Sequence, residues 1–209
     1  MAFGNTNIKQ NVIMKLNNKY FLLRHGQTIY QKEGREENYP PNSGDSLSIT
    51  KEGQEMVKES AQKLKERNIN LIFASPFLRT KQSAEITVEI LGINKEKINY
   101  DERLIDINLG EFMGKSFKES HAFYLGDSIA FDNRPKGGES WYDILKRVKL
   151  FLDELEKKYK NKNILVISHA DPIWLMVGYL RGYTEEKQFL EARNNRRNSY
   201  PSVAQLIEI

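Results

Sequence analysis

The stretch "YFLLRHGQTIY", residues Tyr20–Tyr30, opens the part of the chain in which a fold can be recognised. Its first residues are apolar without alternation, which predicts a strand over Tyr20–Arg24 that is covered on both faces. The strand ends at Arg24-His25-Gly26, whereas an ordinary exit from a strand favours Gly, Asn, Asp or Ser. Two cation-capable side chains at this point indicate a site rather than a simple turn.

Apolar runs of strand length recur along the chain and alternate with helical periodicity. The further predicted strands are "NLIFAS" (Asn70–Ser75), Lys97–Leu104, "NILVIS" (Asn163–Ser168) and the terminal "SVAQLIEI" (202–209). Helices are expected over Thr50–Arg67, 76–92 and Trp141–Tyr159, with two shorter ones near the end. The expected caps or first helical residues are Thr50, Ser75 with Pro76, Asp171 with Pro172, and Thr184, and Gly92 is the expected stop.

Strands and helices that alternate at this spacing predict an α/β fold. We expect a three-layer sandwich with a mostly parallel central sheet and helices on both faces. Residues 19–209 are expected to form a single domain, and 1–18 an N-terminal extension in which "NVIMKL" is a candidate edge strand. Two polar segments, Gln31–Ser48 and Asn108–Gly138, are expected to be irregular lids or binding loops.

Composition excludes several classes of protein. Of 209 residues, 39% are hydrophobic and 29% charged, as in a soluble globular protein, and no run is long enough to span a bilayer. There is no cysteine, hence no disulfide framework or zinc–thiolate site. The net charge of +4 suits an anionic small substrate, whereas the basic cluster "RNNRR" (Arg193–Arg197) is too short to predict nucleic-acid binding. We expect a cytoplasmic protein, because the N-terminal residues do not resemble a secretion signal.

Ligands of a doubly wound sheet collect at the carboxyl ends of its strands. The first strand ends in Arg24 and His25, Arg79 lies in the first turn of the helix after the second strand, and His169 follows the strand 163–168. Arg79 is unfavourable at a helix N-terminus unless an anion lies nearby. These four side chains therefore predict a phosphate pocket.

A pocket of this composition suits phosphoryl transfer. The neutral imidazole of His25 can attack phosphorus and hold the group as phosphohistidine, while arginines and a second, protonated histidine neutralise the equatorial oxygens. Gly26 is expected to let the backbone approach the phosphate closely. The leaving alkoxide needs a proton from a carboxylic acid. The candidates are Asp101, Glu102, Asp106 and Glu111.

The chain resembles the histidine phosphatase superfamily, the phosphoglycerate-mutase-like proteins. Five blocks carry this resemblance, in order, over about Tyr20–Ile209: "LLRHGQT", "SPFLRTKQSAE", "DERLIDINLGEFMGK", "GGES" and "VISHADPI". The resemblance implies hydrolysis of a phosphomonoester through phosphohistidine, with neither a metal nor another cofactor. By this resemblance His25 matches the phosphorylated histidine, and Arg24, Arg79 and His169 match the groups that bind the phosphoryl group, His169 being counted with the catalytic residues.

The resemblance is less direct in the segment that follows the Arg-His-Gly triplet. Gln27 and Thr28 fit a common variant of the family and are predicted phosphate contacts, although Thr28 is equally explained as a helix cap. Gln31 stands where many relatives have Asn. Candidate substrate contacts in the same loop are Tyr30, Arg35 and Tyr39, and His121 matches no motif of the family.

The proton donor is also a departure from the family. The phosphatase-like branch usually has a glutamate in a block resembling "LREIxxGxWEG", and the alignment of Leu104-Ile105-Asp106 places Asp106 there. Because an aspartate side chain is one methylene shorter than that of a glutamate, the Asp106 carboxyl lies closer to its own backbone than the usual glutamate carboxyl would. Glu102 is the alternative donor.

Three functions are compatible with these residues. A phosphatase acting on a phosphorylated small molecule is favoured, as a monomer or homodimer. A mutase of the same fold is the first alternative, but mutases typically carry a glutamate followed by Arg-His-Tyr-Gly, where this chain has Asp106 to Gly110, "DINLG". A catalytically silent binding protein for a phospho-ligand or protein partner is the second, and the intact set of histidines and arginines argues against it.

Overall fold

One sheet organises the computed structural model, which describes residues 16–125, 131–194 and 199–209. Within these residues five strands lie in the order β3-β2-β4-β1-β5. They are β1 Lys19–Arg24, β2 Leu71–Ala74, β3 Ile98–Tyr100, β4 Asn163–Ser168 and β5 Leu206–Glu208. Strands β1 to β4 run parallel, and β5 is antiparallel to β1, so the predicted mostly parallel sheet is confirmed.

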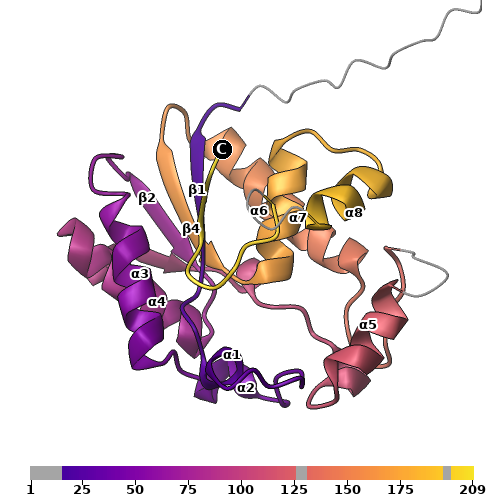
Figure 1. The fold of residues 1–209 in the computed structure, drawn as a ribbon. Coiled ribbons are helices and arrows are strands. Elements are labelled where there is room, and N and C mark those ends of the chain that lie inside the picture. The colour runs from indigo at the N-terminus through magenta and orange to yellow at the C-terminus, as the bar shows by residue number, and fades with distance from the viewer. Residues whose placement is uncertain (1–15, 126–130, 195–198) are drawn as a thin grey trace, which may run out of the picture.

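Helices cover both faces of the sheet, as predicted (Figure 1). Along β1 the side chains of Tyr20 and Leu22 enter the core beneath α6 (Trp141–Lys158) and α7 (Ala170–Leu180). The intervening Phe21 enters the other core, which underlies α3 (Lys51–Gln62) and α4 (Leu78–Leu91). Because successive side chains of a strand point to opposite faces, burial on both faces requires the continuous apolar run seen in the sequence.

Two predicted helix boundaries are confirmed by their backbone bonds. The hydroxyl oxygen of Thr50 accepts a hydrogen bond from the Gly53 N–H and caps α3. Gly92 ends α4 in the left-handed conformation, with φ of 66°. The structure adds a capping box at the start of α6, where Ser140 and Asp143 bond each other's backbone N–H.

Other boundaries differ from the prediction because side chains bond elsewhere. The predicted strand Lys97–Leu104 is only β3, flanked by short 3-10 helices at Lys95–Lys97 (η1) and Glu102–Leu104 (η2). The carboxylate of Asp101 accepts from the Arg103 N–H at 2.9 Å and turns the chain out of the sheet. The chain therefore leaves the sheet after Asp101, whose own N–H still donates to the Ala74 carbonyl at 3.0 Å.

Three predicted caps are wrong. Helix α4 begins at Leu78, so Ser75 does not cap it and Pro76 is not its first residue. Helix α7 begins at Ala170 with His169 at the N-cap, which makes Asp171 and Pro172 its second and third residues. Helix α8 spans Glu186–Asn194 and begins beyond Thr184.

The two polar segments predicted to be irregular contain short helices and bond each other. They form α1 (Ile29–Lys32), α2 (Ser43–Ser46), the 3-10 helix η3 (Gly110–Phe112) and α5 (Phe117–Leu125). Glu37 forms an antiparallel bridge with Ser116, and the Asn38 side chain donates to the Phe112 carbonyl at 3.1 Å. In Figure 1 α1 and α2 lie together below the sheet, and α5 lies apart from them at the right-hand side of the view.

Two segments named in the sequence analysis lie wholly or partly outside the described residues. Most of "NVIMKL" and part of the cluster "RNNRR" lie outside the described residues. No helix among 16–125, 131–194 and 199–209 is both long and apolar enough to cross a membrane.

Gly26 has a packing role that the sequence did not indicate, and its close approach to a phosphate stays a prediction. A Cβ atom at Gly26 would lie 2.6 Å from the Gly53 carbonyl oxygen, and one at Gly53 would lie 2.3 Å from the Gln27 carbonyl oxygen. The two glycines thus let the first turn of α3 lie directly on the backbone after β1. The close backbone approach is to α3, and it fixes the segment that carries His25.

This contact predicts an unusual cost for an alanine in a helix. Alanine normally stabilises a helix relative to glycine by about 1 kcal/mol, but Gly53→Ala should destabilise the protein by about 1–3 kcal/mol because of overpacking. Urea unfolding measures the difference, with Glu59→Ala on the exposed face of α3 as the control. A Gly53→Ala protein as stable as the wild type would contradict the packing described here.

Candidate active site

Neighbouring strand ends bring the predicted site residues together. Strands β1 and β4 pair in register with Arg24 opposite Ser168, so His25 and His169 leave the sheet side by side. Their ring centroids are 5.3 Å apart, and the His25 N–H donates to the Ser168 carbonyl at 3.1 Å. Arg79 is the second residue of α4. The structure therefore brings His25 and His169 together at the carboxyl ends of β1 and β4. The phosphate pocket formed with the two arginines stays a prediction.

The orientation of His25 suits a nucleophile. The side chain is 1% exposed, and its Nδ1 lies 2.7 Å from the Gly26 carbonyl oxygen. A carbonyl only accepts hydrogen bonds, so in the neutral ring Nδ1 carries the proton and Nε2 carries the free electron pair. Gly26 is held in turn, because its N–H donates to the Ser83 hydroxyl at 3.0 Å.

Arg79 is the most deeply buried cation of the site. It is 1% exposed, and its Nη2 donates to Asp106 Oδ2 at 2.9 Å. Its guanidinium carbon lies 4.8 Å from the ring centroid of Tyr39 and 5.1 Å from that of Phe77. The aromatic faces and the carboxylate hold the side chain in place.

His169 lies between a hydroxyl and a carboxylate. Its Nε2 is 2.9 Å from Ser75 Oγ, and its Nδ1 is 3.5 Å from Asp106 Oδ2. The second separation exceeds that of a well-formed hydrogen bond. Asp106 therefore has contacts with both Arg79 and His169, whereas Glu102 is exposed on η2. The geometry favours Asp106 over Glu102 as the proton donor.

Several buried nitrogens of this cluster lack hydrogen-bond partners. Among the described residues, these include Arg24 Nε, Arg79 Nε and His169 Nδ1. An unsatisfied buried donor costs about 1–3 kcal/mol, more for a charged group. Oxygens of a phosphoryl group are the acceptors that would satisfy such donors.

The surroundings favour the neutral form of both histidines, so the protonated second histidine expected from the sequence is not the favoured form of His169. Burial, followed by the charges of Arg79 and Arg24, lowers the pKa of His25 well below its ordinary value. The same causes, in the same order, lower the pKa of His169. A neutral His25 is the form with a nucleophilic Nε2.

The two weaker phosphate predictions, Gln27 and Thr28, are not decided by these contacts. The Gln27 side-chain oxygen accepts from the Thr50 hydroxyl at 3.1 Å. The Thr28 hydroxyl donates to Gln31 Oε1 at 2.7 Å in the capping box of α1. Helix capping accounts for Thr28 directly, and a phosphate contact by either residue stays a prediction.

Of the three candidate substrate contacts, Tyr39 lies nearest the pocket. Its hydroxyl accepts from Gln31 Nε2, and its ring lies over Arg79. Tyr30 packs edge-on against Tyr39 with ring centroids 5.1 Å apart. Arg35 is ion-paired with Glu33 at 2.6 Å on the surface.

Sequence reasoning missed residues whose roles depend on distant partners. Ser75 was expected to cap α4 and instead bonds His169. Arg147 of α6 donates to the carbonyl of Asp106 at 3.2 Å and pairs with Glu139 at 3.0 Å. Glu139 belongs to the quoted block "GGES", which was a signal for the family but not for this contact.

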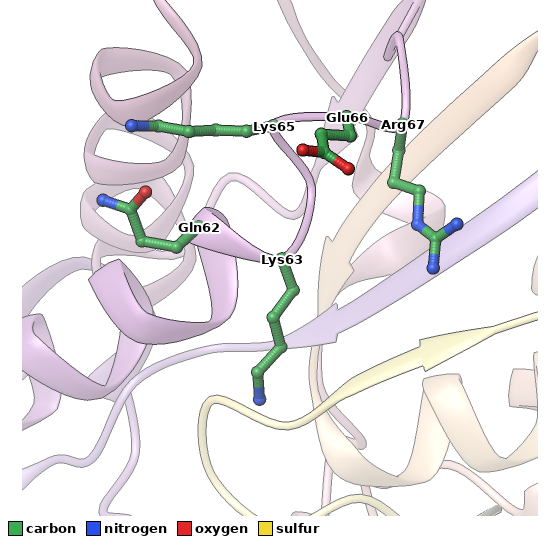
Figure 2. Close-up of a pocket in the computed structure, with 5 residues that line it drawn as sticks. All are labelled: Gln62, Lys63, Lys65, Glu66 and Arg67. Carbon is green, nitrogen blue, oxygen red and sulfur yellow. The ribbon is translucent and has the colours of Figure 1, made fainter.

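A separate pocket lies on the turn after α3 (Figure 2). It is lined by Gln62, Lys63, Lys65, Glu66 and Arg67. Arg67 is ion-paired with Glu208 of β5 at 3.1 Å. None of the predicted site residues lines it.

Known proteins resemble this chain in sequence and in architecture. The chain is 28% identical over 169 residues to phosphoserine phosphatase 1 of Hydrogenobacter thermophilus, covering 78% of this chain and 76% of the relative. It is 25% identical to a probable phosphoglycerate mutase, GpmB, of Erwinia tasmaniensis, covering 78% and 74% of the two chains. A mycobacterial glucosyl-3-phosphoglycerate phosphatase, solved as a complex with VO3, has the same fold, with a TM-score of 0.71, 20% identity and 91% of each chain covered.

The family is decided by a match that spans most of the chain. The model of the histidine phosphatase superfamily (branch 1) matches residues 20–196, a range that contains every predicted site residue. The chain belongs to the histidine phosphatase superfamily (branch 1).

Proposed function

We propose that this protein is a metal-independent phosphatase that hydrolyses a phosphomonoester through a phosphohistidine on His25. The observation that carries the proposal is the orientation of His25, whose Nδ1 faces the Gly26 carbonyl so that Nε2 is left as the nucleophile. Arg24, Arg79 and His169 supply the buried donors for the phosphoryl oxygens. Those donors favour an anionic group over a neutral ester.

The reaction proceeds in two displacements. His25 Nε2 attacks phosphorus, the ester P–O bond breaks, and the leaving alkoxide takes a proton from Asp106. Asp106 then takes a proton from water, which attacks the phosphohistidine and releases phosphate.

The substrate is proposed to be a small phosphorylated molecule. Relatives named as phosphatases for phosphoserine and glucosyl-3-phosphoglycerate make esters of small acidic alcohols the first panel to test. A mutase is the second candidate, supported by the likeness to a probable phosphoglycerate mutase. Release of free phosphate from monophosphoglycerate, rather than transfer to another position of it, separates the two. A cytoplasmic location and a monomer or homodimer are part of the proposal.

The nucleophile is tested by trapping the intermediate. His25→Ala should remove phosphoenzyme formation and lower turnover at least about 100-fold, because the covalent route is lost. Rapid quenching with a radiolabelled substrate measures both, and His121→Ala on α5 is the matched histidine control. Retention of labelled phosphoenzyme by His25→Ala would exclude His25 as the nucleophile.

The pH response of His25 follows from its surroundings. Because burial and the neighbouring arginines lower the pKa of His25, its ring stays neutral at pH values where an exposed histidine is protonated. In an NMR titration, the ring signal that disappears in His25→Gln should titrate well below about pH 6.5. A midpoint at or above that pH would refute the electrostatic description.

The proton donor is tested with leaving groups of different basicity. Asp106→Asn should lower kcat/KM for an alkyl phosphate by about 100-fold or more and spare an aryl phosphate, which departs with little need of a proton. Glu102→Gln is the matched carboxylate control and should affect neither. If only Glu102→Gln showed the dependence on leaving group, the donor would be Glu102.

A further inference from the structure

The backbone around Asp106 is held by a single arginine of the neighbouring helix. Arg147 Nη1 donates to the Arg103 carbonyl at 2.6 Å, and its Nη2 donates to the carbonyl of Asp106 itself at 3.2 Å. Its side chain is 14% exposed. The planar guanidinium group has five donors in a fixed fork, so one side chain spans both ends of this short segment.

Glu139 completes the arrangement from the turn before α6. Its carboxylate pairs with Arg147 Nε at 3.0 Å and accepts from the Asn108 N–H at 3.0 Å. Its own N–H donates to the Asn108 carbonyl at 2.8 Å, and its carbonyl accepts from the Tyr124 hydroxyl at 2.7 Å. The segment 103–108 is thereby fixed on both sides of Asp106.

Holding the segment 103–108 in place affects the position of the proposed proton donor, Asp106, more than the position of the other site residues. The pair lies behind the backbone of Asp106, whereas the Asp106 carboxylate faces Arg79 and His169. An aspartate has one methylene less than a glutamate with which to adjust its reach. Its carboxyl position therefore follows its backbone closely, and a displacement of about 1 Å at a reacting group can cost about 100-fold in rate.

We propose that Arg147 and Glu139 are positioning residues that hold the Asp106 carboxyl at the leaving oxygen. The inference rests on the proposed function, in which Asp106 gives the proton. Neither residue transfers a proton itself. Their pair acts through the carbonyl of Asp106 and the N–H of Asn108. Loss of either partner removes part of the support of this segment, although Ser168 still donates to the Leu104 carbonyl at 2.7 Å.

The test compares leaving groups in variants of both residues. Arg147→Lys keeps the charge, and thus the folded state, but a single ammonium cannot reach both carbonyls and Glu139. Glu139→Gln is the second variant. Each should lower kcat/KM for an alkyl phosphate by about 10-fold or more and for an aryl phosphate by less than about 3-fold. Because the two residues act as a unit, the double variant should lose little more than either single one.

The matched control breaks another ion pair between the same segment and the same helix. Arg103 Nη1 pairs with Glu154 of α6 at 2.8 Å, and Glu154 is 55% exposed. Glu154→Gln should leave both substrates unchanged, because it leaves the carbonyl of Asp106 bonded. Urea midpoints for all variants report any general loss of stability.

These measurements distinguish a failure of the positioning role from a failure of Asp106 as the proton donor. Suppose that Asp106→Asn shows its dependence on the leaving group in the same panel. The positioning role is then overturned if Arg147→Lys and Glu139→Gln lower kcat/KM equally for both substrates. It is also overturned if neither variant lowers kcat/KM for the alkyl phosphate. If Asp106→Asn shows no such dependence, the proposed donor is wrong and the positioning role falls with it. A selective loss in both variants, absent from Glu154→Gln, supports the inference.

Discussion

The burial of several cationic groups in one place is the constraint on which the rest of this structure depends. Arg79 is 1% exposed and its partner among the described carboxylates is Asp106. Arg24 lies within electrostatic reach of the same histidines and of the buried Asp171, and its Nη1 donates to the Pro201 carbonyl at 2.9 Å. Burial, followed by the charges of Arg79 and Arg24, lowers the pKa of both histidines. This excess of buried positive charge is the electrostatic basis of the proposed phosphoryl site.

The sheet supplies the rigidity that this arrangement requires. Strands β1 and β4 are central, parallel and buried between two cores, and the register places Arg24 opposite Ser168. Since His25 and His169 follow directly, their separation is determined by the spacing of neighbouring strands. The contact of Gly26 with Gly53 of α3 then limits where the chain runs next. The catalytic geometry is a property of main-chain pairing more than of side-chain choice.

The two central strands could be predicted from the sequence, because they depend on local pattern. Apolar runs without alternation predicted β1 and β4, and the residues after them predicted which side chains meet, because parallel strands end at a common edge. The assignment of Asp106 needed the family resemblance as well. The alignment of "DERLIDINLGEFMGK" selected Asp106, and in the structure its carboxylate pairs with Arg79, although the strand predicted before it is shorter than expected. Its role as proton donor stays a prediction.

Features that depend on which distant segments meet were not predictable from local pattern. Ser75 fits the rules for a helix cap, yet its hydroxyl lies against His169, 94 residues away. The partners of Glu139 lie on α6 and on the segment 103–108, and neither periodicity nor capping rules connect them. The helices within the two polar segments were missed because they are short and are stabilised by bonds between those segments.

The buried nitrogens of Arg24, Arg79 and His169 are proposed to form one phosphoryl-binding site centred on His25. A crystal structure of the protein with vanadate, a mimic of the phosphoryl group in transfer, tests this proposal most directly. We expect vanadium bonded to His25 Nε2, with its oxygens accepting from Arg24 Nε, Arg79 Nε and His169 Nδ1. Vanadate bound elsewhere, with these nitrogens still lacking partners, would contradict it.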